Sequence, residues 1–117
     1  MVVQSPLTDN ELDRLFRALA DATRRDIVAR LLSDEPASVS TLAARYDMSF
    51  AAVQKHVAVL EKAGLVTKRP QGRERIVCGN PKRIAQARAL LAQLERIWVS
   101  RLSQLDAVLA DPNPSPE

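Results

Sequence analysis

Cysteine and histidine are scarce in this chain of 117 residues. A single cysteine, Cys78, excludes an intramolecular disulfide, and this suits the reducing cytoplasm. With only one histidine, His56, the chain offers too few ligands for a closed transition-metal site. The N-terminus shows no signal peptide, and no apolar run approaches the roughly 18 residues that span a membrane. We therefore expect a cytoplasmic protein with no cofactor and no membrane association.

Catalytic constellations are missing as well. The spacing supports no Ser-His-Asp trio around His56, and we find no glycine-rich phosphate loop and no paired carboxylates in a predicted cleft. The sequence therefore predicts a protein that is not an enzyme.

Aromatic residues make up only 3% of the chain, so Leu, Val, Ile and Ala must build its core. This composition and the scarcity of β-branched runs favour a mostly helical fold. A capping box at Thr8 and Glu11 starts the first helix, and Asp21, Ser40 and Ser49 are the expected caps of the next three. Apolar spacing then predicts five helices, which cover about residues 9–20, 22–33, 41–46, 50–63 and 81–110.

A helix-turn-helix and a β-hairpin follow from the order of these elements. The third and fourth helices are short and are joined by a tight connection at residues 47–48, which is the helix-turn-helix arrangement. Gly64 ends the fourth helix. Residues 65–67 and 76–78 have strand character, and residues 69–72, with Pro second and Gly fourth, fit a type I turn between them.

Basic residues are concentrated between residues 55 and 83. Eight basic residues face only two acidic ones there, which gives a formal charge of +6, whereas the whole chain carries +3. This clustering is compatible with an ordinary solvated surface or with a face that binds a polyanion.

The predicted fourth helix has the side chains that a helix in the DNA major groove needs. Its core side carries Val53, Val57 and Leu60, whereas small and polar residues occupy the other side. A glutamine amide can pair with adenine, a lysine can reach guanine or phosphate, and an alanine methyl can touch thymine. Together with the basic hairpin, this predicts a set of DNA-binding residues: Ser49, Phe50, Ala51, Gln54, Lys55, His56, Lys62, Arg73 and Arg75.

Two blocks resemble the winged-helix regulators of the ArsR type (the arsenical-resistance repressor family). Residues 19–27 (LADATRRDI) are similar to the family's L-A-D-P-T-R-R-x-I opening, with Ala22 in place of proline. Residues 48–66 (MSFAAVQKHVAVLEKAGLV) are similar to its recognition helix, with Gln54 where serine is common and Val57 where leucine is common. The resemblance covers roughly residues 9–80, including a wing with Gly72 and Arg73.

This resemblance implies a homodimeric repressor that binds double-stranded DNA at an imperfect inverted repeat, often in its own promoter. Many family members sense metals through cysteine pairs on the third helix or Asp/His sets on the last helix. Here residues 41–46 contain no cysteine and the last helix contains no histidine, so the chain is more similar to members without a metal site. The inducer is unknown.

His56 and Cys78 have plain structural interpretations. His56 lies beside the core face of its helix, and we expect a structural or phosphate-contacting role. Cys78 is expected to be a small apolar core residue, because a redox switch needs a second thiol or an exposed electropositive setting. A metal site shared between two chains stays open but has no support.

The last helix is expected to form the dimer interface. Apolar residues recur along it every seven residues, and a helix of thirty residues is about 45 Å long, more than a small domain can cover. The alternative is that it folds back on its own chain. The predicted interface residues are Leu12, Ile84, Leu91, Leu94, Trp98 and Leu105.

The sequence thus predicts four segments: a flexible N-terminal tail over 1–7, a winged helix-turn-helix domain over 8–80, a dimerisation helix over 81–110 and a disordered tail over 111–117. The predicted function is that of a dimeric, sequence-specific repressor. Two alternatives stay open, a winged helix used only for protein contacts and a non-specific nucleoid-type DNA binder. Site-specific protection of its own promoter would exclude both.

Overall fold

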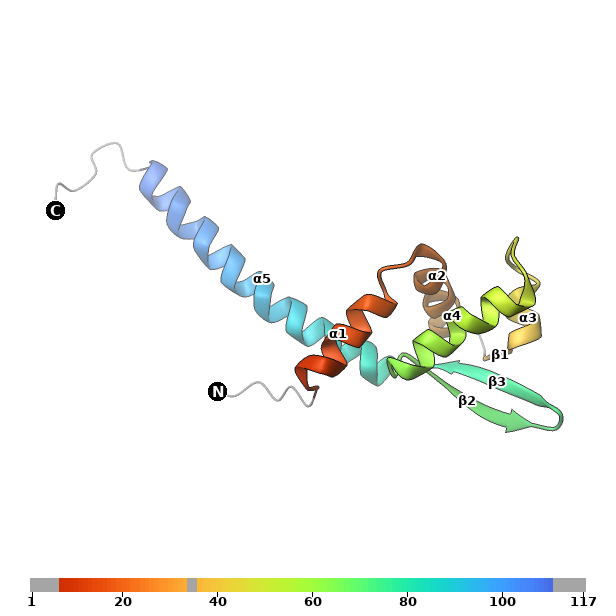
Figure 1. Cartoon of the computed structure of the whole chain (residues 1–117). Helices are drawn as coiled ribbons and strands as arrows, with labels where there is room; N and C mark the ends of the chain where they lie inside the picture. The colour runs from red at the N-terminus through yellow and green to blue at the C-terminus, as the bar shows by residue number, and fades with distance from the viewer. Residues whose placement is uncertain (1–6, 34–35, 111–117) are drawn as a thin grey trace. The chain divides into compact units, whose positions relative to one another are not determined.

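The computed structural model describes residues 7–33 and 36–110 and confirms a mostly helical chain (Figure 1). The chain divides into two compact units between Ala87 and Arg88, and each is described by itself. The elements run in the order α1 (Asp9–Ala18), α2 (Ala22–Ser33), β1 (Ala37–Ser38), α3 (Val39–Ala43), α4 (Phe50–Lys62), β2 (Val66–Gln71), β3 (Glu74–Gly79) and α5 (Pro81–Ala110).

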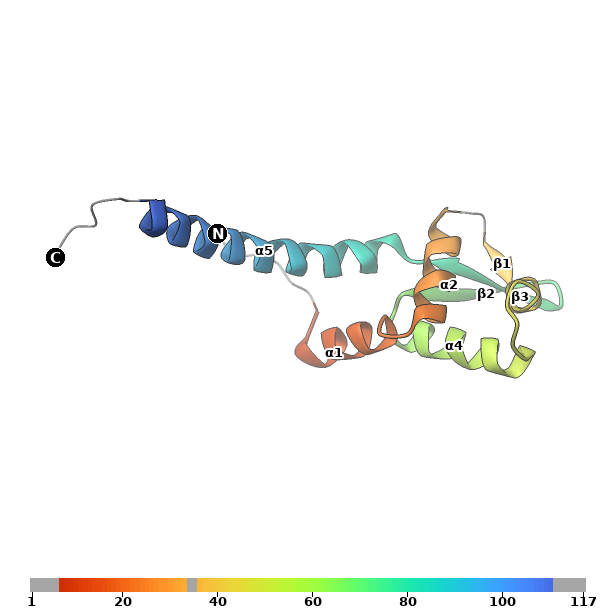
Figure 2. The same ribbon diagram turned by 90° about the horizontal axis from the view of Figure 1, so that it is seen from above.

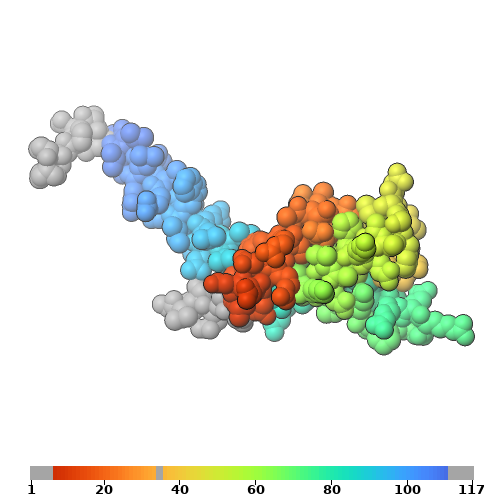
Figure 3. All heavy atoms as spheres, viewed as in Figure 1, coloured from red at the N-terminus to blue at the C-terminus, as the bar shows by residue number. Residues whose placement is uncertain are grey.

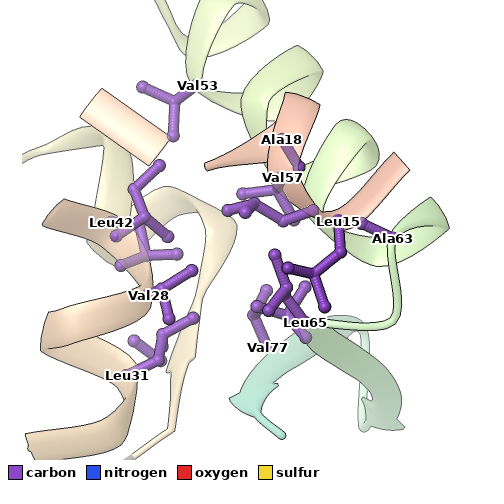
Figure 4. Close-up of a cluster of buried hydrophobic side chains, with 14 of the residues drawn as sticks. Leu15, Ala18, Val28, Leu31, Leu42, Val53, Val57, Ala63, Leu65 and Val77 are labelled. Carbon is purple, nitrogen blue, oxygen red and sulfur yellow. The ribbon is translucent and has the colours of Figure 1, made fainter. Parts of the chain in front are cut away.

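One apolar core holds the first unit together, with side chains from all of its helices and from the sheet (Figure 4). Leu15 of α1, Leu42 of α3 and Val77 of β3 are fully buried. The inner face of α4 is buried in the same core, as its spacing predicts. Burying a Leu or Val side chain contributes roughly 1.5–3 kcal/mol, so this core fixes how α4 is presented.

Most of the predicted helix ends are confirmed. Thr8 and Glu11 form the reciprocal capping box of α1, Ser49 caps α4, and the Asp21 carboxylate accepts a hydrogen bond from the backbone N–H of Arg24. The predicted cap of the third helix is wrong. Ser38, not Ser40, is the N-cap, and its hydroxyl accepts from the Thr41 backbone N–H.

Because α3 ends at Ala43, Tyr46 lies beyond the helix, although the sequence analysis placed it on the helix. The shift follows from β1, which the sequence analysis missed. Ser38 pairs with Ile76 as the last residue of that strand and is thereby positioned to begin the helix.

The sheet has three antiparallel strands in the order β1-β3-β2 rather than a hairpin alone. The predicted turn at residues 69–72 is also wrong. Gln71 pairs with Glu74, so the loop consists of Gly72 and Arg73, and the φ angle of Gly72 is +64°. A glycine with positive φ at the first loop position fits a type II′ turn. Pro70 lies within β2, which it can do because β2 is an edge strand.

Two residues at the edges of the predicted segments pack into the core of the first unit. Leu7, assigned to the tail, is buried in the core, and Ala87 of α5 is buried there as well. The first two turns of α5 therefore belong to the winged unit. The predicted tails at 1–6 and 111–117, and residues 34–35 of the predicted stop of α2, lie outside the described residues.

The second unit contains the rest of α5, whose large apolar side chains are exposed. Trp98 is 63% exposed and Leu91 is 53% exposed. Pro81 is the first residue of the helix, after Asn80, as predicted. Within the described part of the chain, no helix is long and apolar enough to cross a membrane.

Candidate nucleic-acid interface

Helix α4 presents a polar outer face on an apolar support. Val53, Val57 and Leu60 are fully buried beneath it. The outer residues Ala51, Gln54, Lys55 and Lys62 are exposed, and Phe50, in the first turn, keeps 48% of its surface exposed. In the space-filling view, α4 and the hairpin tip both reach the surface of the visible face (Figure 3). A surface of this kind can reach both the bases and the backbone of a duplex.

A cleft of about 270 Å³ lies between the first turns of α4, the start of α3 and the hairpin. In both ribbon views the hairpin runs beside α4, with its tip toward the N-terminal end of that helix (Figure 2). Three cations and one carboxylate line the cleft, so its charge is positive. The lining residues are Ser38, Val39, Ser40, Phe50, Gln54, Lys68, Arg73, Glu74 and Arg75.

An ion pair joins the hairpin to α4, and a hydrogen bond joins the end of α4 to the residue before α5. Lys68 of β2 lies 3.5 Å from the Glu61 carboxylate of α4, and its side chain is only 16% exposed. At the end of α4, Gly64 has a φ angle of +78°, and a Cβ there would lie 2.9 Å from the Arg83 guanidinium. Asn80 Nδ2 donates to the Gly64 carbonyl at 2.8 Å. The exit of α4 is therefore tied to the start of α5.

The residues of the 19–27 block connect α1, α2 and α4. The Arg24 guanidinium donates to the Ala18 carbonyl at 2.6 Å and to the Arg17 carbonyl at 3.2 Å, at the C-terminal end of α1. Its Nη1 lies 3.3 Å from Nδ1 of His56 on α4. The backbone hydrogen bond from Arg24 is the largest of the effects that lower the pKa of Asp21 below its ordinary value. The block therefore fixes α4 through polar contacts as well as through the core.

A second polar cluster fixes the connection between α3 and α4. The Tyr46 hydroxyl donates to Asp26 Oδ2 of α2 at 2.6 Å. Arg30 Nε donates to the same oxygen at 2.7 Å, and its guanidinium lies 5.7 Å from the centre of the Tyr46 ring. Burial, with the bond to Asp26, raises the pKa of Tyr46 to about 12, and the hydrogen bonds from Tyr46 and Arg30 hold the pKa of Asp26 below its ordinary value.

The structure brings many of the predicted DNA-binding residues together. Phe50, Gln54, Arg73 and Arg75 line the one cleft, whereas Lys62 lies at the far end of α4. Of the predicted interface residues, Leu12 and Ile84 pack partly against the core of their own chain. The other four, Leu91, Leu94, Trp98 and Leu105, are exposed.

Sequence reasoning missed Arg24, Lys68 and Tyr46 as supporting residues. Lys68 entered the sequence analysis only as one of the basic residues between 55 and 83. Arg24 entered it only as part of the block at residues 19–27 that resembles the family. No group of three or more His, Cys, Asp or Glu residues in the described chain is placed to hold a metal ion. Cys78 is half-buried on β3, opposite Thr67.

Known proteins that are similar to this chain include helix-turn-helix transcriptional regulators. A family model described as a helix-turn-helix domain matches residues 19–69. The chain is 42% identical over 91 residues to the HTH-type transcriptional regulator Rv2034 of Mycobacterium tuberculosis. The aligned region covers 78% of this chain and 81% of that protein.

Solved structures agree with these sequence matches. The chain is similar to the ArsR family transcriptional regulator RHA00566, with a TM-score of 0.72 at 36% identity over 80% of this chain and 96% of that one. It is also similar to an ArsR-like transcriptional regulator from Rhodococcus sp. RHA1, with a TM-score of 0.74 at 30% identity over 88% and 95% of the two chains.

Proposed function

We propose that this chain, which belongs to the ArsR family of winged helix-turn-helix transcriptional regulators, is a dimeric repressor. Its operator would be an inverted repeat near its own promoter. In this proposal α4 enters the major groove and the β2-β3 wing contacts the adjacent backbone or minor groove. The observation that carries it is the positive cleft in which Gln54 of α4 and Arg73 of the wing face the same space.

The arrangement suits a division of labour between reading and anchoring. Gln54 is exposed near the start of α4, where a helix in the major groove comes nearest to the base edges. Arg73 and Arg75 stand on the wing, where guanidinium groups meet phosphates or enter a narrow minor groove. Such contacts give both the sequence preference and the salt dependence of a specific DNA-binding protein.

A second copy of the chain is the proposed partner of the exposed α5. Leu91, Trp98 and Leu105 lie seven residues apart on one continuous helix, so they form a stripe on one side of it. Two copies related by a two-fold axis would bury this stripe and present two α4 helices to successive turns of DNA. The same stripe is expected to keep the protein dimeric without DNA.

Footprinting on the DNA upstream of its own gene tests the proposal, with a shuffled duplex of equal length and composition as the control. We expect protection of a two-fold related site and binding at least 10³-fold tighter than to the shuffled duplex, the lower end for specific regulators. Equal affinity for both duplexes would indicate a non-specific binder. Binding to neither would favour a winged helix that contacts only proteins.

The proposal also includes a cytoplasmic location and no enzymatic role. Relatives that cover most of the chain are named as transcriptional regulators, and this supports both points.

A further inference from the structure

The Arg24 side chain is anchored on α1 and reaches across to α4. Its Nε donates to the Ala18 carbonyl at 2.6 Å and its Nη2 donates to the Arg17 carbonyl at 3.2 Å. These two bonds fix the plane of the guanidinium, because its donors form a rigid fork. The remaining Nη1 is therefore held in place 3.3 Å from His56 Nδ1.

This contact determines which nitrogen of His56 carries the proton. A guanidinium only donates hydrogen bonds, so Nδ1 of His56 must accept and cannot hold a proton. Asp21 Oδ1 lies 4.0 Å from the same Nδ1, which is beyond hydrogen-bonding distance, and it already accepts from the Arg24 backbone N–H. The neutral ring then has its proton on Nε2.

The Nε2 atom of His56 is not fully buried. The side chain is 22% exposed. Among the residues that the structure describes, every buried side-chain nitrogen or oxygen has a hydrogen-bond partner, and Nε2 of His56 has none, so it is not buried. A donor is thus available on α4 without a partner from the described chain.

His56 lies on the side of α4 away from the wing. At 100° per residue, Gln54 and Glu61 fall on the wing side of the buried face, and His56 falls on the other side. A helix in the major groove has a phosphate backbone along each side, and the wing contacts only one of them. The Nε2–H of His56 lies on the side of the phosphate backbone that the wing does not contact.

We propose that Arg24 is a positioning residue that holds His56 as the Nε2–H tautomer and directs this N–H to a DNA phosphate. The proposal deepens the function above and depends on it, because the phosphate is that of the bound operator. It assigns a role in DNA binding to Arg24, which itself contacts neither base nor phosphate in this scheme.

The tautomer is measured first in the free protein, where DNA plays no part. Long-range ¹H–¹⁵N correlation spectra of the single histidine are expected to show a pyridine-type Nδ1 and a pyrrole-type Nε2 for the neutral ring. In Arg24→Met the spectrum is expected to move toward a mixture of tautomers. A wild-type ring with its proton on Nδ1 would overturn the proposal.

Operator affinity is then compared for Arg24→Met and for Arg25→Met as the matched control. The Arg25 substitution also removes a charge and a helix-end bond, the 2.8 Å contact with the Leu19 carbonyl, but among the described residues Arg25 makes no hydrogen bond or ion pair with α4. We expect Arg24→Met to weaken operator binding several-fold, up to the roughly tenfold that a lost hydrogen bond to a charged group costs. Arg25→Met is expected to weaken it much less, and both variants are compared at a temperature below their melting transitions.

Two His56 variants separate the two ring nitrogens. His56→Asn places an amide where Nδ1 was and removes the outward donor, so its loss should be at least that of Arg24→Met. His56→Gln places an amide N–H near the position of Nε2 and is expected to lose less affinity than His56→Asn. The double variant Arg24→Met/His56→Asn should bind no more weakly than His56→Asn alone.

The salt dependence distinguishes positioning from a direct phosphate contact by Arg24. In this scheme Arg24 itself meets no phosphate and releases no counterion, so Arg24→Met should leave the slope of log K against log salt unchanged. A slope lowered by about one per subunit, or additive losses in the double variant, would overturn the proposal. Failure of the wild type to prefer operator over shuffled DNA would instead overturn the proposed function and leave the tautomer result intact.

Discussion

Tyr46 shows how a single side chain outside any helix fixes the helix-turn-helix connection. Its hydroxyl donates to Asp26 of α2 at 2.6 Å, and Arg30 packs over its ring. We expect Tyr46→Phe to lower the free energy of unfolding at neutral pH by about 1–2 kcal/mol, because Asp26 loses a donor. Chemical denaturation with Ala44→Ser, at an exposed position after α3, as a control measures this.

The difference between wild type and Tyr46→Phe should also depend on pH. The pKa of Asp26 is lowered in the folded state, so its contribution is present above the ordinary value of 3.8 and is lost as pH falls. The pKa of Tyr46 is raised from 10.0 to about 12, so its contribution is present below 10.0 and is lost as pH rises toward 12. A difference that stays constant from pH 7 down to pH 2 would contradict the assigned role of the Asp26 contact.

Metal ions are not expected to change DNA binding, because one cysteine and one histidine provide too few soft or borderline ligands. Zinc, cadmium or arsenite at micromolar concentration should leave the operator complex intact in gel-shift titrations. Ethylenediaminetetraacetate treatment should likewise have no effect. Metal-induced release that persists in a His56→Ala/Cys78→Ser variant would reveal a carboxylate site that this prediction misses.

At the scale of elements, α4 and the wing should fail differently when each is altered. Gln54→Ala removes a candidate base contact, which typically costs about 1–3 kcal/mol and relaxes specificity at one position. The affinity gap between operator and random DNA should narrow, with little change in salt dependence. Arg73→Ala should keep most of that gap and lower the salt slope by about one per subunit.

Titrations of both variants on operator and random duplexes at three or more salt concentrations test these roles. Lys55 is not included, because a lysine at its height on α4 can reach either base or phosphate. Equal losses on both duplexes for Gln54→Ala, or an unchanged slope for Arg73→Ala, would show that reading and anchoring are assigned to the wrong elements.

The same elements show what sequence alone can predict. Helix α4 was predicted well because Ser49, the buried period of Val53, Val57 and Leu60, and Gly64 all indicate one helix. The wing turn was misplaced because Pro70 favours a type I turn locally, whereas pairing with β3 places Pro70 inside an edge strand. The register, a tertiary property, overrides the local preference of the proline.

The start of α3 and the polar contacts of α4 were missed for related reasons. A five-residue helix gives no readable period, so two nearby serines, Ser38 and Ser40, compete as caps until β1 pairs with β3. Arg24 and His56 are 32 residues apart in sequence. Their contact depends on how α1, α2 and α4 approach each other through the core, and spacing along the chain contains no signal of it.

At the scale of the whole molecule, the proposed dimerisation through α5 would let two DNA-binding units act together. The large apolar residues of α5 from Leu91 to Leu109 are 42% to 73% exposed. A continuous apolar surface of this kind is typical of a protein interface. A dimer would carry two α4 helices to one operator. Once the first helix has bound its half-site, the second would bind at a high effective local concentration, which raises the total affinity. Dimer formation and operator affinity should therefore be lost together.

Trp98→Asp tests this link between α5 and DNA binding. A carboxylate in the middle of the proposed interface would be buried without a partner, which costs several kcal/mol in each subunit. We expect monomers by size exclusion with light scattering, an intact winged unit by near-native melting, and severe loss of operator binding. Ser100→Asp, on the opposite side of α5 by helical spacing, adds the same charge and is expected to stay dimeric. A Trp98→Asp protein that remains dimeric would show that the interface lies elsewhere, and a monomer that keeps full operator affinity would separate dimerisation from DNA binding.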